Sequence, residues 1–246
     1  MPLANRLLNV FAAPGEVFDA VRAAPPTAVN WLIPLILSIV MSAVSVALIY
    51  SQPTVVQQLR EQQTKALDDQ VKAGKMTRAQ ADQAAAWTDT FFGPSFARLM
   101  GTVSASVVNL IRICWWGLVL WGLGRLVLRA EFTYVKALEV AGLGFMIAIL
   151  GGLVSALLTV CLGKICTLSL GLLALQLGPQ SLLRMALQSA DFFDLWLLGV
   201  MTMGLARLAG VSWLKAFPLT LAYWLVMEGF LLGIAWFFIS LSSGFK

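Results

Sequence analysis

The sequence has no histidine, only three tyrosines and three cysteines, and few charged residues. The lack of histidine excludes Ser-His-Asp and Cys-His catalysis, HExxH zinc sites and His-ligated haem. Charged residues make up 12% of the 246 residues, compared with about 25% in soluble domains, while 59% are hydrophobic. We therefore expect an all-α fold, a polytopic membrane helix bundle whose main solvent is lipid.

Common catalytic and nucleotide-binding motifs are also missing. The chain contains no GxxxxGK[ST] phosphate loop, no GxGxxG fingerprint and no GxSxG elbow. We predict no catalytic residue, no metal ligand and no cofactor, so that an enzyme is the least favoured of the functional classes. The three cysteines do not form a disulfide framework. The net charge of +5 is interpreted as basic residues flanking membrane spans, and no nucleic acid is expected as a partner.

Five apolar stretches are long enough to cross a bilayer, which takes about 20 residues per helix. The predicted spans cover about 31–50, 99–124, 137–162, 192–208 and 216–241. A further apolar stretch at 165–177 is short and more typical of a re-entrant or interfacial segment. If it crosses instead, there are six spans and both termini lie on one side.

Basic residues in the short loops predict the orientation of the chain. With five spans, the side of the N-terminus holds seven of them, against three on the other side. They are Arg6, Arg22, Arg125, Arg129, Lys136, Arg207 and Lys215. The cytoplasmic side is the one enriched in Lys and Arg, so the N-terminus is expected to be cytoplasmic.

Residues 1–30 are expected to form a cytoplasmic amphipathic N-terminal segment, which precedes a transmembrane domain at 31–246. A short helix after Pro14 places Val17, Phe18 and Val21 on one face, and we expect it to lie flat on the membrane surface.

A charged, Gln- and Ala-rich stretch follows the first span. It predicts an extramembrane helical hairpin inserted at 52–92, with helices over roughly 54–73 and 78–92. Gly74 stands where a C-cap glycine belongs, and Thr77 and Gln80 have the spacing of a capping box. As the one sizeable soluble feature, the hairpin is the expected site of contact with a partner.

Arg112 and Glu228 each fall near the centre of an apolar span. A charge at this depth costs about 2.5–3.5 kcal/mol on insertion scales. We hypothesise that the two side chains pair inside the bundle, helped by Asn109 one turn from Arg112. The favoured interpretation is a structural ion pair, and the alternative is part of an ion or substrate pathway.

Small residues recur at helical spacing in two spans and predict close helix packing. One stripe lies in the third span and a GxxxG pair in the fifth: Gly144, Ala148, Gly152 and Ala156, and Gly229 and Gly233.

Two acids and three tryptophans admit both a structural and a functional interpretation. Asp191 and Asp194 could line a polar vestibule or hold a cation, but are more typical of interfacial acids at a helix N-terminus. Glu139, near the inner end of the third span, is interpreted in the same way, with Lys136 nearby as a candidate partner. Trp115, Trp116 and Trp121 could form a ligand cage, but more often such residues pack and anchor a span at the interface.

Residues 11–18 (FAAPGEVF), followed by Trp31 and Pro34 at the first span, resemble the opening of bacterial Yip-domain proteins. The Yip family is named for membrane proteins that interact with Ypt/Rab GTPases. The layout is also similar, with a cytoplasmic N-terminal stretch and five closely packed spans. The resemblance implies a non-enzymatic, multi-pass protein of a bacterial inner membrane. It carries over no GTPase-binding residue, because the Phe-Gly-Pro run at 92–94 follows the first span instead of preceding the bundle.

The sequence thus predicts a scaffold or partner-binding component of membrane organisation or trafficking. Its expected partners are the lipid bilayer and a membrane-bound or soluble protein, with self-association into a homo-oligomer as an alternative. The runner-up function is a small transporter or channel that uses Arg112 and Glu228.

Overall fold

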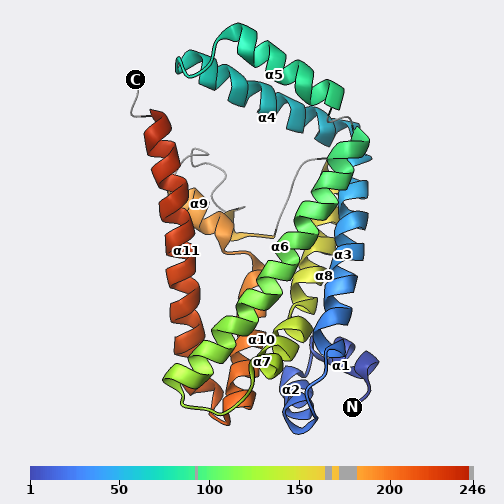
Figure 1. The fold of residues 1–246 in the computed structure, drawn as a ribbon, viewed down its shortest axis with the longest axis vertical. Helices are drawn as coiled ribbons and strands as arrows, with labels where there is room; N and C mark the ends of the chain where they lie inside the picture. Colours follow the sequence, from blue (N-terminus) through green and yellow to red (C-terminus); the bar gives the residue numbers. More distant parts are fainter. Residues whose placement is uncertain (92–93, 164–167, 172–181, 244–246) are drawn as a thin grey trace.

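The computed structural model describes residues 1–91, 94–163, 168–171 and 182–243, which fold almost entirely as helices (Figure 1). This confirms the predicted all-α helix bundle. In chain order the elements are α1 (Leu3–Asn9), α2 (Pro14–Ala23), α3 (Val29–Tyr50), α4 (Pro53–Lys72), α5 (Arg78–Phe91), α6 (Pro94–Gly122), the π-helix η1 (Leu123–Val127), α7 (Tyr134–Gly144), α8 (Met146–Leu162), α9 (Leu182–Ser189), α10 (Phe192–Ala209) and α11 (Trp213–Ser243).

Within the described residues, five helical stretches are long and apolar enough to cross a membrane, as predicted. They are Val29–Tyr50, Phe96–Val127, Tyr134–Leu162, Phe192–Ala209 and Trp213–Phe237. The third stretch is two helices, because the helix is interrupted at Phe145 between α7 and α8. The apolar segment predicted at 165–177 lies outside the described residues, apart from 168–171.

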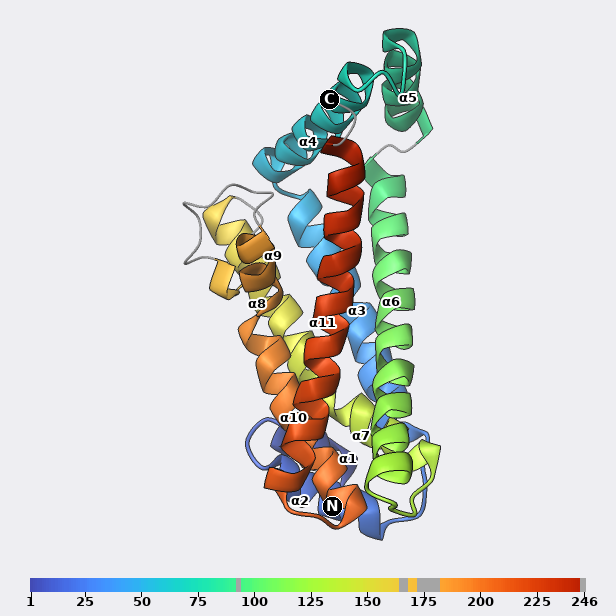
Figure 2. The ribbon, with the colours of Figure 1, turned by 90° about the vertical axis from the view of Figure 1, so that its left-hand side faces the viewer.

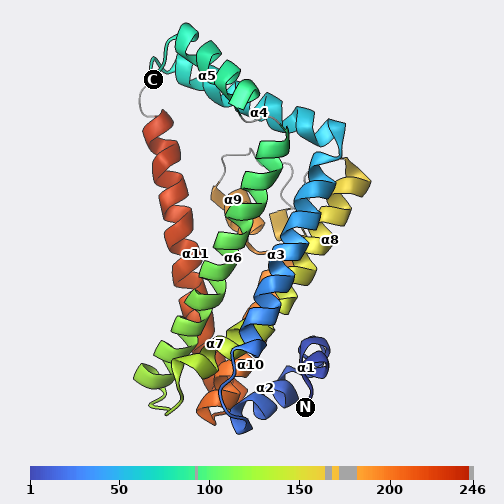
Figure 3. The same ribbon diagram turned by 45° about the vertical axis from the view of Figure 1, so that its right-hand side comes forward.

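The spans pack around α3, α6 and the α7–α8 pair, which contact one another along their lengths. Figure 3 shows α3 beside α8. Helix α10 packs against α7 and α8 on one side and α11 on the other, so α11 is the outermost span. Its outward surface is apolar, as lipid-facing surface should be: Leu225, Val226, Phe230, Leu231 and Phe237 are all more than half exposed.

The apolar face of α2 is buried by protein. Val17, Phe18 and Val21 are fully buried and join the main hydrophobic cluster with residues of α7 and α10. The expectation that this helix lies flat on the membrane with its apolar face in lipid is therefore wrong. The physical reason is that α7 and α10 pack against α2 and cover this face. Gly204 of α10 allows α7 to approach, because a Cβ there would clash with Val140, while Phe18 lies at ordinary contact distance from the same point.

Helices α4 and α5 form the predicted hairpin. Gly74 ends the first helical arm with a φ of +67°, a left-handed conformation that favours glycine. The capping box is confirmed: Gln80 N donates to Thr77 Oγ1 (3.2 Å) and Thr77 N to Gln80 Oε1 (2.9 Å). Figure 2 shows the hairpin at the opposite end of the bundle from α1 and α2.

The base of the hairpin is fastened to the bundle. Val55 of α4 is fully buried, and Gln58 Nε2 donates to the backbone oxygen of Gly163, just after α8 (3.3 Å). Beyond this base, α4 is largely exposed. The hairpin therefore has a fixed root and a free surface.

The small-residue stripes are used only in part. Gly144 packs on Met201 of α10 and Ala156 is buried, but Gly151, not Gly152, is the glycine that Phe193 covers. A Cβ added at Gly152, Gly229 or Gly233 would meet no described atom within 4 Å. The GxxxG pair therefore does not bring α11 against another described helix of the same chain. The stripe of the third span does not stay on one helix face, because the helix is interrupted between α7 and α8.

Gly142 of α7 lies directly against the backbone of α3, because a Cβ there would lie 2.5 Å from Trp31 Cα. Backbone cannot give way like the end of a side chain, so Gly142→Ala should lower the free energy of unfolding by about 2 kcal/mol or more. Thermal unfolding in detergent measures the loss. Gly229→Ala is the matched control and should be neutral or slightly stabilising; equal stability of the two variants would contradict the packing.

Candidate functional site

Two charged side chains from different helices pair inside the membrane domain, and a third lies on another helix within electrostatic range. Arg112 of α6 donates from Nη2 to Asp194 Oδ1 of α10 at 3.0 Å, and both side chains are about 40% exposed. Glu228 of α11 interacts with the hydroxyl of Ser189, at the end of α9, and electrostatically with both Arg112 and Asp194. One basic and two acidic groups thus form a polar layer within the spans.

The start of α10 places the two aspartates. Asp191 is the N-cap and accepts a hydrogen bond from Phe193 N at 2.8 Å, as the interpretation of an acid at a helix N-terminus expects. Asp194 follows in the first turn, where the helix dipole favours a negative charge. The backbone beside this start is paired, with Leu170 N donating to Ala190 O (3.1 Å) and Phe192 N to Leu168 O (3.0 Å).

The polar layer continues from Arg112 toward α3. Asn109 Nδ2 donates to Ser42 Oγ at 3.1 Å, which links α6 to α3. The guanidinium of Arg112 also lies 5.5 Å from the ring centroid of Phe145, where a cation is attracted by the ring face. A cavity of about 250 Å³ between α3, α6 and α8 is lined by these groups, including Arg112, Asn109 and Ser42.

The predicted pairing of Arg112 with Glu228 is wrong in detail. Within the described part of the chain, the ion-pair partner of Arg112 is Asp194, and Asn109 bonds to α3 instead of to Arg112. The sequence alone assigned Asp194 to the interface, because the fourth span was taken to begin there. One feature of the sequence indicates that Asp194 can reach a neighbouring helix. It lies in the first turn of the shortest predicted span.

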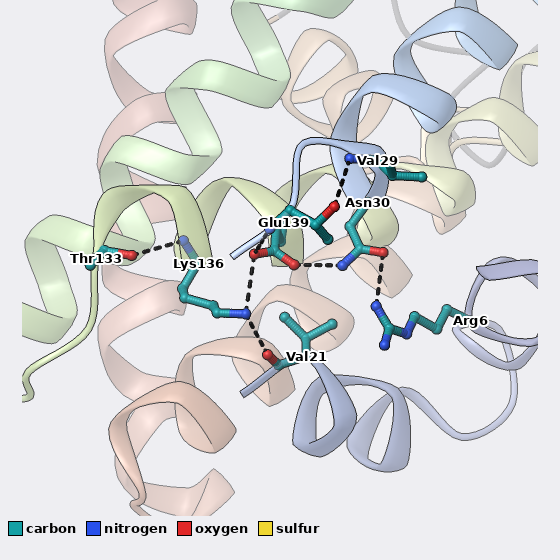
Figure 4. A network of polar contacts seen from close by, with 8 residues as sticks. Arg6, Val21, Val29, Asn30, Thr133, Lys136 and Glu139 are labelled. Atoms are coloured by element: carbon teal, nitrogen blue, oxygen red, sulfur yellow. Dashed lines mark hydrogen bonds and ion pairs between the residues drawn. The ribbon is translucent and has the colours of Figure 1, made fainter. Parts of the chain in front are cut away.

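A second polar cluster lies at the other end of α3 and is better buried (Figure 4). Glu139 is fully buried and pairs with Lys136 Nζ at 3.2 Å, as the sequence suggested. Its other oxygen accepts from Asn30 Nδ2, and Asn30 Oδ1 accepts from Arg6 Nη1 at 3.1 Å. Lys136 Nζ also donates to the backbone oxygen of Val21 at 2.7 Å.

This cluster, which we call the N-terminal lock, comprises Arg6, Asn30, Lys136 and Glu139. It joins α1, α2 and α3 to α7, with Thr27 N as a further donor to Glu139 at 3.1 Å. Sequence reasoning found the Lys136–Glu139 pair but not the rest, because nothing in the chain marks Arg6 or Asn30 as its partners. Apart from Arg6 Nε, which is buried without a hydrogen-bond partner among the described residues, these contacts join the members of the lock to one another and to nearby backbone. The lock therefore has the character of a structural element.

The tryptophans of α6 face different surroundings. Trp116 is buried and packs edge-on against Tyr223 of α11, with ring centroids 5.4 Å apart. Trp115 is exposed and donates from Nε1 to the Tyr223 hydroxyl. Trp121 lies near the guanidinium of Arg125 at the end of the span. They hold α6 to α11 and do not surround a common space.

The acids of the polar layer do not form a metal centre. Among the residues that the structure describes, no three side chains of His, Cys, Asp or Glu stand close enough to hold a metal ion. Asp191 and Asp194 have their own partners, Phe193 N and Arg112. The polar layer is therefore an arrangement of hydrogen bonds and one ion pair.

A comparison with protein families identifies the chain's relatives. The family model described as the Yip1 domain matches residues 8–237, nearly the whole chain, including every helix that contributes to the polar layer. No curated protein and no solved structure matches the chain.

Proposed function

The chain belongs to the Yip1 domain family, and we propose that it is a non-enzymatic scaffold or partner-binding protein of a bacterial inner membrane. The observation that carries the proposal is the α4–α5 hairpin, which is rooted at Val55 and Gln58 and exposes most of its remaining surface. A rooted, charged element beyond the spans is suited to holding a second protein at a fixed distance from the bilayer.

The distribution of charge supports an orientation with the N-terminus in the cytoplasm. The starts of α3, α7 and α11 and the ends of α6 and α10 gather at the end of the bundle where α1 and α2 lie (Figure 1). Of the seven loop residues counted from the sequence, Arg6 and Arg22 lie in α1 and α2, and the other five lie at or beside these helix ends. By the positive-inside rule this end is cytoplasmic, and the hairpin then faces the other side of the membrane.

Site-specific photo-crosslinking tests the role of the hairpin. A photoreactive residue in place of Gln63, exposed on α4, should form a crosslink to one defined protein in intact cells. The matched control is the same residue in place of Val226, exposed on the lipid-facing side of α11, which should not give this product. Identical products from the two positions, or none from Gln63, would contradict a partner-binding hairpin.

A small transporter or channel is the second candidate, and the polar layer favours it. Because Arg112 pairs with Asp194, Glu228 has no ion pair in the described structure. Carboxylates inside spans often serve ion or proton pathways. Proton flux into proteoliposomes, read with an internal pH dye, should fall to the background in Glu228→Gln and persist in the hairpin variant Glu61→Gln. Wild-type flux equal to that of empty liposomes would exclude this function.

A further inference from the structure

The cavity between α3, α6 and α8 is unusual because its wall is polar in the middle of two apolar spans. Ser38, Ser42 and Ser45 are spaced three or four residues apart and so share one face of α3. Asn109 and Arg112 face them from α6, one turn apart. Ser38 Oγ donates to the Leu35 carbonyl (2.7 Å) and Asn109 Nδ2 to Ser42 Oγ (3.1 Å). The remaining hydrogen-bonding capacity of the wall is costly at this depth unless polar atoms occupy the space before it.

The wall offers mainly hydrogen-bond donors and one positive charge. A guanidinium carries five N–H donors, and the contact with Asp194 involves one nitrogen of Arg112, whose side chain remains 42% exposed. The residues that line the cavity in the described structure include one cation and no carboxylate. Asp194 pairs with Arg112 but is not among the residues that line the cavity, so the pair holds Arg112 in place while its other N–H groups remain available.

From this arrangement we propose that the cavity binds a single anionic group, a phosphate or a carboxylate, against Arg112 and the hydroxyls of Ser42 and Ser45. Bidentate pairing of Arg with such oxygens is the strongest contact available to this wall. The volume of about 250 Å³ holds one small group, equal to about eight waters at ~30 Å³ each. The site is independent of the hairpin, and therefore of the scaffold function proposed above.

The position of the cavity favours a group that a lipid carries. The polar groups are bordered by apolar lining residues that are partly exposed, among them Met41, Val46 and Leu153. Acyl chains can lie on this surface while a headgroup enters between the helices. A free anion, in contrast, has to cross the apolar layer to reach the same groups, which costs several kcal/mol for an unpaired charge.

Gly152 provides a way to close the cavity without disturbing the fold. It lines the cavity, it is exposed, and a Cβ there would meet no described atom within 4 Å. In Gly152→Leu the new side chain should therefore extend into space that the ligand uses. Gly233→Leu on α11 is the matched control, since its Cβ is equally free and far from the cavity.

Binding is measured on the purified full-length chain by native mass spectrometry. The probes are dioleoylphosphatidylglycerol, dioleoylglycerol with the same chains but no phosphate, and inorganic phosphate. We expect one phosphatidylglycerol to be retained about tenfold more strongly than dioleoylglycerol, as for the loss of a charge-assisted hydrogen bond. Gly152→Leu should abolish this preference and Gly233→Leu should keep it.

Each result decides the proposal. Retention of inorganic phosphate at one site that Gly152→Leu removes supports the anion site but assigns it to a free ion. Equal retention of the two lipids together with no bound phosphate overturns the proposal, as does a preference that Gly152→Leu leaves unchanged. If Gly152→Leu is less thermostable than Gly233→Leu, Ser45→Leu replaces it, and persistence of the preference in that variant also overturns the proposal.

Discussion

Glu139→Ala is expected to lower the free energy of unfolding by about 3–5 kcal/mol, because removing one partner strands a buried charge. The variant leaves Lys136 Nζ, whose side chain is 10% exposed, with only the Val21 carbonyl, and it deprives Asn30 Nδ2 and Thr27 N of their acceptor. Unfolding in detergent, followed by the loss of helical circular dichroism, measures the difference. The effect should also loosen α1 and α2, which the lock joins to the spans.

An exposed ion pair supplies the control for this prediction. Asp68→Ala removes the partner of Arg78 in the hairpin, where the side chains are 36% and 66% exposed. Solvent screens such pairs, so the expected cost is about 0–1 kcal/mol. The lock would not be a main source of stability if Glu139→Ala and Asp68→Ala destabilised the chain equally.

Arg112 and Asp194 are expected to depend on each other energetically. Arg112→Met and Asp194→Leu should each destabilise the chain, and the double variant should cost about 1–3 kcal/mol less than the sum of the two. The reason is that each single variant leaves the other charge without its partner at 3.0 Å within the spans. Unfolding free energies of the four proteins of the cycle measure the coupling.

A parallel cycle separates this pair from the one predicted by the sequence. Arg112→Met combined with Glu228→Leu should show a smaller coupling, since Glu228 interacts with Arg112 only over a longer distance. A larger coupling with Glu228 than with Asp194 would restore the original pairing and contradict the geometry of the polar layer.

The sequence was sufficient for the helices because their signals are local. Lengths of apolar stretches, Gly74 and the Thr77–Gln80 box depend on neighbours within a turn or two, and lipid as a solvent strengthens the length signal. Even the interruption of the third span at Phe145 falls within a stretch that was correctly predicted to cross. The five spans and the hairpin could therefore be predicted without knowledge of the packing.

The contacts between helices could not be predicted in the same way. From the sequence, Glu228 is the carboxylate at the depth of Arg112, and Asp194 falls at the interface. That Arg112 pairs with Asp194 depends on how α10 lies against α6, which no local pattern encodes. Likewise, Val17 and Phe18 form a face that suits either a membrane surface or another helix. The packing of α2 against α7 and α10, which the sequence of α2 does not encode, decides between the two.

The most direct test concerns the two ends of the molecule, which should lie on opposite sides of a bilayer. In a variant with Cys114, Cys161 and Cys166 replaced by serine, a single cysteine is introduced at Asp69 of α4 or at Glu16 of α2, both exposed. A membrane-impermeant maleimide applied to intact bacterial spheroplasts should label the first at once and the second only after permeabilisation. Labelling of both cysteines in intact spheroplasts, or of Glu16→Cys alone, would contradict a five-span bundle with a cytoplasmic N-terminus.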